Sequence, residues 1–315
     1  MAAIAPKLVT VFGGSGFIGR HLVQRLAAQG HLIRVATRNP EEALYLKVMG
    51  RVAQIVPISA DIANEASVAR AVAGADWVVN LVGILAPGGR ASFDRVHAQG
   101  PGIVAAASAA AGVQRLVHVS ALGASDHSPS AYGRSKARGE ASVRSAFAGA
   151  TILRPSVVFG PEDNFFNMFA GLMRFTPVLP VLKTQFQPVY VGDVADAIVA
   201  SLERDDAVGA TYELGGPEVA SGRRIMELLL KYTGRKRCLM SVPFGLLAVE
   251  GAILQYLPGK LLTLDQVRSL RVPNVVAAGA KTLVDLGIQA TPMEAVLPGY
   301  LNRFRLGLRH HLHQA

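Results

Sequence analysis

Cysteine and charge are scarce in this chain, and no long apolar run is present. Cys238 is the only cysteine among 315 residues, so an internal disulfide is impossible and a reducing compartment is expected. A membrane-spanning helix needs roughly 18–20 apolar residues in a row. The segment that comes nearest, Phe244 to Leu257, is shorter and contains Glu250, so we expect no transmembrane segment.

The N-terminus lacks the pattern of a targeting signal. Only six residues precede the first predicted strand, which begins at Lys7, and they have neither signal nor transit character. A bacterial cytoplasmic protein fits these features, and so does an organellar chain that has already been trimmed.

Charged residues make up only 17% of the chain, whereas half of the residues are apolar. This composition excludes wholesale disorder and supplies a packed core. The length suits two average domains, or one large α/β unit with an appended lobe.

The net charge of +10 is unevenly distributed. Residues 1–160 carry 16 Lys and Arg against 8 Asp and Glu, and residues 161–315 carry 16 against 14. Within the second half, Arg223 to Arg237 gathers six basic residues against Glu227, and residues 303–315 hold three arginines and three histidines. A basic surface can meet nucleic acid, anionic lipid or an acidic protein face. No zinc-finger spacing, basic heptad region or aromatic RNA motif accompanies it, so we expect a lipid or protein surface and no nucleic acid.

Short apolar strands alternate with helical stretches as far as Arg154, which is typical of a parallel sheet covered by helices on both faces. The strands are rich in Val, Ile and Leu without clean alternation, as expected where both faces are buried. Phe17 to Gln29 and Ile103 to Ala111 predict two of the covering helices. The fold class is therefore α/β, a doubly wound parallel sheet of the Rossmann type. The predicted strands are Lys7–Phe12, Leu32–Thr37, Val52–Pro57, Trp77–Val82, Arg115–Ser120 and Thr151–Arg154.

After Arg154 the pattern loosens, and prolines punctuate the chain. Val189 to Val191 predicts a short strand before a helix from Asp193 to Leu202, and Tyr212 to Leu214 predicts a last sheet strand. The remainder indicates a smaller, mostly helical C-terminal lobe that closes over one end of the sheet. The predicted division is a dinucleotide-binding domain of residues 1–160 with 186–216, a lobe of residues 161–185 with 217–300, and a basic tail of residues 301–315.

A glycine-rich loop joins the first strand to the first helix and predicts a dinucleotide site at the carboxyl ends of the strands. Gly13 permits a tight turn, Gly16 lets the backbone approach a pyrophosphate, and Gly19 allows the helix and strand to pack closely. The pyrophosphate then meets the amide groups at the start of the helix. A glycine turn that binds no ligand is the alternative. The cofactor-binding residues expected here are Gly13, Ser15, Gly16, Phe17, Ile18 and Gly19.

The end of the second strand indicates which nucleotide is bound. An NAD site usually has Asp or Glu there, to hold the ribose 2′-hydroxyl. This strand ends in Thr37 and Arg38, and a guanidinium can clamp a 2′-phosphate with two parallel hydrogen bonds. Arg20 is a second candidate cation. NADP(H) is therefore favoured over NAD(H), although Arg38 is also a residue type that often lies free in solvent.

Two later strand ends predict further cofactor contacts. Asp61 and Ile62 follow the third strand, where the adenine edge is expected, and Asn80, Val82 and Gly83 end the fourth strand beneath the nicotinamide ribose. These signals are weaker, because a carboxylate or a small residue after a strand is also ordinary turn chemistry.

Ser120, Tyr132 and Lys136 form the predicted reaction centre. Tyr132 and Lys136 are one helical turn apart and share a face. The ammonium is expected to shift the pKa of the Tyr132 phenol downward from ~10, towards the range useful in general acid–base catalysis, and to contact the nicotinamide ribose. Ser120 can donate a hydrogen bond to a carbonyl oxygen while the phenol transfers the proton. The alternative is a surface helix with an incidental Tyr and Lys.

The histidines support no comparable site. His118 lies within an apolar strand and is expected to be a core residue whose hydrogen bonds are satisfied. His310, His311 and His313 have no further ligand cluster beside them, so no metal site is expected.

With these residues in place, the chain resembles an extended, atypical short-chain dehydrogenase/reductase. Within that superfamily it is most similar to the nucleotide-binding accessory subunits of respiratory complex I, the alpha-subcomplex subunit nine family, in their alphaproteobacterial form. The more general part of the match is carried by 13–19, 118–124 and 132–136. The part more specific to the complex I relatives is carried by 153–163, 187–194, 212–217 and 262–267.

The resemblance implies a tightly held NADPH with a mainly structural role, to which Pro155 and Val158 of the 153–163 motif also contribute. It also implies docking to complex I subunits where the peripheral and membrane arms meet, with contact to lipid or to quinone-site subunits through the C-terminal lobe. The corresponding location is the cytoplasmic side of the bacterial inner membrane, as a peripheral protein. Pro273 stands where an acidic residue is expected in this family, which leaves the fold untouched and alters the local docking surface.

Three functions fit these features. The motifs after residue 153 favour an accessory or assembly subunit of complex I that binds NADP(H). The intact Ser120, Tyr132 and Lys136 favour a free-standing NADP-dependent reductase or dehydrogenase of an apolar carbonyl compound. A redox-sensing regulator ranks last, because such proteins usually dispense with the tyrosine.

Overall fold

The computed structural model describes residues 5–89, 91–242, 244–245 and 263–305. Its centre is a seven-stranded sheet in the order β11-β6-β5-β4-β1-β2-β3, and every pairing in it is parallel. The order reverses between β1 and β4, which is where an open α/β sheet binds its ligand. The strands are β1 Leu8–Phe12, β2 Leu32–Thr37, β3 Ile55–Ser59, β4 Trp77–Asn80, β5 Arg115–Val119, β6 Thr151–Pro155 and β11 Thr211–Leu214.

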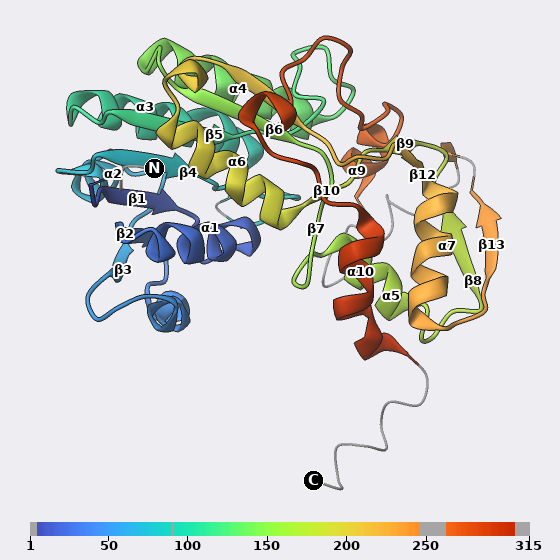
Figure 1. Ribbon diagram of the computed structural model, residues 1–315. Helices are drawn as coiled ribbons and strands as arrows, with labels where there is room; N and C mark the ends of the chain where they lie inside the picture. Colours follow the sequence, from blue (N-terminus) through green and yellow to red (C-terminus); the bar gives the residue numbers. More distant parts are fainter. Residues whose placement is uncertain (1–4, 90, 243, 246–262, 306–315) are drawn as a thin grey trace, which may run out of the picture.

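Helices cover both faces of the sheet, as predicted (Figure 1). On one face, α1 (Phe17–Ala28) and α6 (Val191–Glu203) bury Leu22, Leu26 and Ile198 against Val9 and Val11 of the central strand. The other face is covered by α2 (Glu65–Val72), α3 (Gly100–Ala110) and α4 (Ala131–Ala146). Because both faces are buried, the strands are apolar almost throughout.

The predicted strands agree with the structure to within one or two residues, with one exception. The third strand was expected at 52–57 and lies at Ile55–Ser59. Residues 51–54 form a turn in which Ala53 has a φ of 62° and Val52 is fully exposed. Val52 is apolar and β-branched, a residue type typical of strands, which explains why the third strand was predicted to begin at this turn.

The C-terminal lobe has its own apolar core, in which Phe166, Leu179, Ile225 and Leu297 are buried together. It is mainly helical, as expected, but it also contains two short ladders, β9 with β12 and β8 with β13. Figure 1 shows β8 and β13 beside α7 at the far side of the lobe. Its elements are α5 Phe165–Leu172, β8 Val178–Val181, β9 Gln185–Phe186, β12 Ala220–Ser221, α7 Gly222–Thr233, β13 Cys238–Ser241, α9 Leu264–Ser269 and α10 Met293–Leu301.

Hydrogen bonds of the half-buried Asn274 side chain fasten the lobe to the sheet domain. The side-chain oxygen of Asn274 accepts hydrogen bonds from the Ser156 hydroxyl at 2.6 Å and from the Val157 amide at 3.1 Å. These two residues lie between β6 and β7 (Val158–Phe159), which pairs with β10 (Val189–Tyr190). Residues 273–276 therefore run along the junction, and Pro273 is exposed there.

None of the helices in the described ranges has the length and apolar character needed to cross a membrane. Most of the apolar segment Phe244 to Leu257 lies outside the described residues, and so does the end of the tail with its three histidines.

Candidate nucleotide site

The glycine-rich loop has the geometry that its sequence predicts. Gly13 has a φ of +77°, a conformation that L side chains rarely adopt, and its amide donates to the Ala36 carbonyl of β2. A Cβ on Gly19 would lie 2.4 Å from the Gly13 carbonyl oxygen, so α1 and the loop pack together only because this side chain is absent. Gly16 is exposed, and a Cβ there would meet a single atom within 4 Å. The loop therefore presents bare backbone at the start of α1.

The other loop residues divide between holding the loop and leaving it open. The Ser15 carbonyl accepts a hydrogen bond from the Tyr45 hydroxyl at 2.9 Å, which ties the loop to the turn after β2. Phe17 packs beside Gly160, where an added Cβ would lie 3.3 Å from the ring. Ile18 packs against the core beneath the sheet. Gly16 is thus the exposed residue of the loop, and Ser15 beside it is half-buried.

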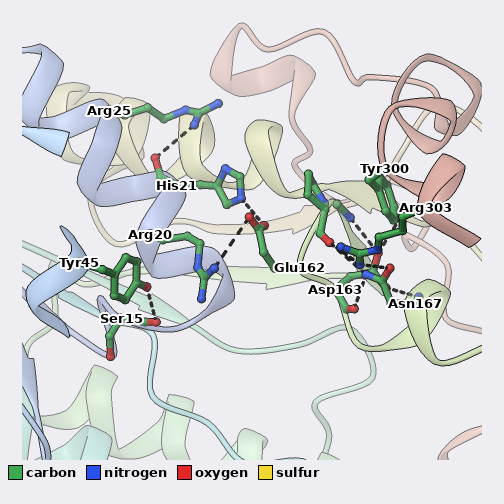
Figure 2. A network of polar contacts seen from close by, with 12 residues as sticks. Ser15, Arg20, His21, Arg25, Tyr45, Glu162, Asp163, Asn167, Tyr300 and Arg303 are labelled. Carbon is green, nitrogen blue, oxygen red and sulfur yellow. Dashed lines mark hydrogen bonds and ion pairs between the residues drawn. The ribbon is translucent and has the colours of Figure 1, made fainter. Parts of the chain in front are cut away.

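Arg38 is exposed at the end of β2, and no hydrogen bond or ion pair joins it to any other residue in the described ranges. Its guanidinium is therefore available to a ligand, and Thr37 beside it is half-buried. Arg20, the second candidate cation, is already engaged. It lies over the Tyr45 ring at 5.3 Å and 3.8 Å from the Glu162 carboxylate, as Figure 2 shows.

The contacts of Arg20 belong to a wider network between the two parts of the protein (Figure 2). His21 on the next position of α1 reaches the same Glu162 carboxylate at 3.0 Å. Asp163 beside it accepts the Tyr300 hydroxyl of α10 at 2.7 Å. Burial raises the pKa of Asp163, and the hydrogen bonds from Tyr300 and from backbone amides oppose this rise only in part. The start of α1, which carries the glycine loop, is thus joined to the lobe.

The end of β3 is positioned by its own turn. The Asp61 carboxylate accepts the Ala63 amide at 3.0 Å and lies 3.4 Å from Arg95. Ile62 is buried and packs against Gly100 at the start of α3. Asp61 is accessible at the carboxyl edge of the sheet, whereas Ile62 contributes mainly to the core.

Asn80 and His118 lie side by side on β4 and β5. Asn80 accepts the Val82 amide at 3.1 Å, and its amide nitrogen lies 3.2 Å from His118 Nδ1. His118 was expected to be satisfied, but its buried Nε2 has no hydrogen-bond partner in the described part of the chain. Burial, with Lys136 nearby, holds the pKa of His118 well below its usual range.

Ser120 and Lys136 face the same end of the sheet. Lys136 is buried, and its Nζ donates to the Val119 carbonyl at 3.2 Å and lies close to Gly83. Burial lowers the pKa of Lys136 to about 8, partly opposed by Glu140 on the next turn. The Ser120 hydroxyl is buried and has no partner among the residues the structure describes. Such a hydroxyl is costly unless a ligand or water satisfies it.

The pKa of Tyr132 differs from the sequence-based expectation. Burial raises it to about 12, and Lys136 is not among the causes of the shift. The ring contacts Phe93 and His97 edge-on, at centroid distances of 5.9 and 5.3 Å. The prediction that Lys136 lowers the pKa of Tyr132 is therefore wrong for this conformation, because the low-polarity surroundings of the phenol dominate.

Sequence reasoning missed the residue that holds the start of α4. The Asp265 carboxylate of α9 accepts the Ala131 amide at 2.7 Å and the Tyr132 amide at 3.0 Å. Thr263 and Gln266 form a capping box that fixes α9 itself. The capping box of α9 can be read from the sequence. The contact of Asp265 with the start of α4 cannot, because the two segments lie more than a hundred positions apart.

Buried ion pairs fix the rest of α4. Glu140 is almost fully buried, and Arg154 of β6 donates to its two oxygens at 2.8 and 2.7 Å. Pro155 follows on the same strand, where its carbonyl accepts the Leu122 amide, and Val158 packs against the sheet core. In this structure both residues act chiefly in the framework of the site.

These residues fit a nicotinamide dinucleotide. The loop offers bare backbone to a pyrophosphate, Arg38 offers an unpaired cation beyond β2, and Ser120 offers an unsatisfied hydroxyl near Lys136. The three features lie along the carboxyl edge in the order Arg38, loop and Ser120, at the ends of β2, β1 and β5, with β4 between the last two. A bound nicotinamide would supply the hydride chemistry, and the chain would supply binding, orientation and a proton donor.

Comparison with known proteins agrees with this geometry. The model of the NAD dependent epimerase/dehydratase family matches residues 9–215. NADH dehydrogenase (ubiquinone) 1 alpha subcomplex subunit 9 of Arabidopsis thaliana is 34% identical over 321 residues, covering 97% of this chain and 80% of that protein. The chain belongs to the NAD dependent epimerase/dehydratase family. The match to the subunit 9 protein continues through the C-terminal lobe, beyond the epimerase/dehydratase region.

Two other similar proteins are enzymes by name. A ceramide reductase of Caulobacter vibrioides is 34% identical over 202 residues, covering 64% of this chain and 62% of that protein. The structure of NADPH-dependent quinone oxidoreductase QOR2 from Escherichia coli, complexed with NADPH, has a TM-score of 0.71, with 19% identity over 94% of this chain and 99% of that one. This likeness supports the Rossmann fold and does not distinguish NADP from NAD.

Proposed function

We propose that this protein is an NADP(H)-binding accessory subunit of a respiratory complex I, with the nucleotide serving mainly as a structural element. The similarity to subunit 9, which extends over 97% of the chain and includes the lobe, carries this proposal. The sequence match to the ceramide reductase, by contrast, covers only 64% of this chain.

The preference for NADP(H) rests on Arg38. Its exposed guanidinium has no partner in the described ranges, and the sequence provides no carboxylate at this strand end to hold a ribose 2′-hydroxyl. A 2′-phosphate would receive charge-assisted hydrogen bonds from it. The proposed contacts to the rest of the cofactor come from the residues predicted above, with Ser15, Gly16 and Lys136 foremost.

A structural role for the nucleotide rests on the similarity to subunit 9, and the surroundings of Tyr132 are consistent with it. Its pKa of about 12 makes the phenol a weaker acid than a free tyrosine. General acid–base catalysis works best when the pKa lies near the working pH, so this conformation is poorly prepared for proton transfer. The Lys136 ammonium donates to a backbone carbonyl, and it is not among the causes that set the pKa of the phenol.

A peripheral location on the cytoplasmic side of the bacterial inner membrane, at the junction of the two arms of complex I, completes the proposal. The lobe exposes apolar side chains beside basic ones. Phe175 is 81% and Met240 53% exposed. Arg174 lies over the Phe175 ring at 5.6 Å, and the exposed Lys236 precedes β13, the strand that carries Met240. Such a combination suits a lipid headgroup region or a subunit facing one. The division into domain, lobe and tail given above belongs to the same proposal.

The test is co-purification from the native host. A tagged chain should migrate with NADH dehydrogenase activity in native gels of detergent-solubilised membranes. Deleting it should reduce the amount of assembled complex. Recovery of the tagged chain only as a free monomer, with complex I unchanged in the deletion strain, would contradict the proposal.

A free-standing reductase is the second candidate, and the unsatisfied Ser120 hydroxyl favours it. That hydroxyl is buried and unpaired among the described residues, so a substrate carbonyl bound against it would accept its hydrogen bond, with Tyr132 at the start of α4 as the proton donor. The purified protein would then oxidise NADPH with an apolar carbonyl compound. Tyr132→Phe would abolish this activity while leaving NADPH binding intact, which separates the two candidates.

A further inference from the structure

His97 is a buried histidine that the predicted cofactor site does not include. It lies in the short π-helix η2 (Asp94–Gln99) that leads into α3, and its side chain is 1% exposed. Its Nε2 accepts a hydrogen bond from the Ile84 amide at 2.9 Å. Its Nδ1 lies 3.0 Å from the Ser135 hydroxyl, which donates to the Tyr132 carbonyl at 2.7 Å.

These partners allow one tautomer of His97. A backbone amide can only donate, so Nε2 must carry a lone pair and the ring proton must be on Nδ1. Nδ1 then donates to the Ser135 oxygen, whose own proton goes to the Tyr132 carbonyl. Burial, and secondarily Lys136, lowers the pKa of His97 to about 3, so the ring stays neutral at any physiological pH.

The His97 ring therefore joins two segments of the site. One is the loop after β4, through Ile84, and the other is α4, through Ser135. The same ring stacks on Phe93 at 5.4 Å and meets Tyr132 edge-on. Gly83 lies between Lys136 and His97: a Cβ on Gly83 would be 3.5 Å from Lys136 Nζ and 3.6 Å from His97 Nε2.

We propose that His97 is a positioning residue for the nicotinamide half of the bound nucleotide. It holds the 82–84 loop at a fixed distance from α4, and so sets the position of Gly83 relative to Lys136, the two residues expected beside the nicotinamide ribose. The inference rests on the proposed nucleotide site and adds to it a residue that contacts no substrate. It acts through Ile84 and Ser135.

A histidine that merely filled the core would predict something different. Filling space requires volume, and a phenylalanine supplies it. Positioning requires an acceptor for Ile84 and a donor for Ser135 at the same time, and a phenylalanine supplies neither. The two roles therefore separate in a His97→Phe variant, if binding is measured at the two ends of the nucleotide independently.

The experiment compares NADPH with adenosine 2′,5′-bisphosphate, which lacks the nicotinamide half. Binding of each probe to the full-length protein is measured by calorimetry. His97→Phe should weaken NADPH binding about tenfold, as expected for the loss of one or two hydrogen bonds, and should leave the bisphosphate affinity within about twofold. His97→Gln, whose amide oxygen can accept from Ile84, should recover most of the NADPH affinity.

His31→Phe is the matched control. His31 is equally buried, and its Nδ1 accepts the Lys7 amide at 3.1 Å, but it precedes β2 at the opposite end of the sheet. The variant should leave the affinity for both probes unchanged. If His97→Phe does not fold, Ser135→Ala removes the same link more gently and should weaken NADPH binding about threefold, with the bisphosphate unaffected.

Two results would overturn the inference. One is a His97→Phe or Ser135→Ala protein that binds NADPH as the wild type does. The other is an equal loss for both probes, which indicates a general structural role. A wild-type protein that binds neither probe would instead refute the nucleotide site on which the inference rests.

Discussion

Alanine substitutions at Gly16 and Gly19 should separate ligand binding from folding within a single turn of the loop. In Gly19→Ala, the new Cβ would lie 2.4 Å from the Gly13 carbonyl oxygen and 2.5 Å from that of Gly14. Both atoms are backbone, so the helix and the loop must move apart. Overpacking of this kind costs about 1–3 kcal/mol, which corresponds to a melting temperature lower by several degrees.

Gly16→Ala should behave in the opposite way. Its φ of −77° and ψ of −175° are open to any residue, and the new Cβ would meet only the Gly13 oxygen, at 3.2 Å. We expect a change in unfolding free energy within about 0.5 kcal/mol. The methyl group would, however, stand where the pyrophosphate approaches the backbone, and NADPH binding should weaken tenfold or more, on the order of 1.4 kcal/mol.

Thermal melting with and without NADPH measures both effects. Gly171→Ala in α5 is the control, because nothing lies within 4 Å of the added Cβ. It should melt and bind like the wild type, or be slightly more stable. The reasoning is refuted if Gly16→Ala binds NADPH with full affinity, or if Gly19→Ala melts at the wild-type temperature.

Three further predictions concern the cation at β2, the start of α4 and the buried lysine. Arg38→Asp should weaken NADPH binding about 10–100-fold while improving NADH binding, measured by calorimetry, with Arg51→Asp as an exposed control that changes neither. Asp265→Ala should destabilise the protein by about 2–3 kcal/mol, because two backbone amides at the start of α4 lose a charged acceptor. Asp265→Asn should retain part of the lost stability. Equal denaturation midpoints for Asp265→Ala and the wild type would contradict the assignment. Burial lowers the pKa of Lys136 from its ordinary value of 10.5 to about 8 in the folded protein. Between these two pH values the unfolded state therefore binds more protons than the folded state. The contribution of Lys136 to the free energy of unfolding then rises with pH across this window. Lys136→Met should therefore be most stable relative to wild type below pH 8 and lose roughly 3 kcal/mol of that advantage by pH 10.5, whereas a pH-independent difference would show that the lysine is not buried.

The sheet and the glycine loop could be predicted because their signals are local. Gly13, Gly16 and Gly19 lie between a buried strand and an amphipathic helix, and each glycine has a separate physical reason within the same turn. The strand at Ile55–Ser59 was displaced in the prediction because propensity favours Val52 in a strand, whereas the left-handed Ala53 turns the chain there.

The interactions around α4 could not be predicted, because they join distant segments. Asp265 caps the start of this helix from the lobe, and His97 reaches it from the turn before α3. The direction of the Tyr132 pKa was predicted from a neighbour in sequence, Lys136. Burial of the phenol raises this pKa instead, and the sequence does not place Phe93 and His97, which pack against the ring.

The nucleotide carried by the native protein tests the account most directly. Mass spectrometry of the small molecules released on denaturing the purified protein should find NADP(H), present in near-stoichiometric amounts. A preparation stripped of ligand should melt at a higher temperature once NADPH is added, and less so with NADH. A protein that is purified without nucleotide, and whose melting temperature responds to neither coenzyme, would contradict the central claim.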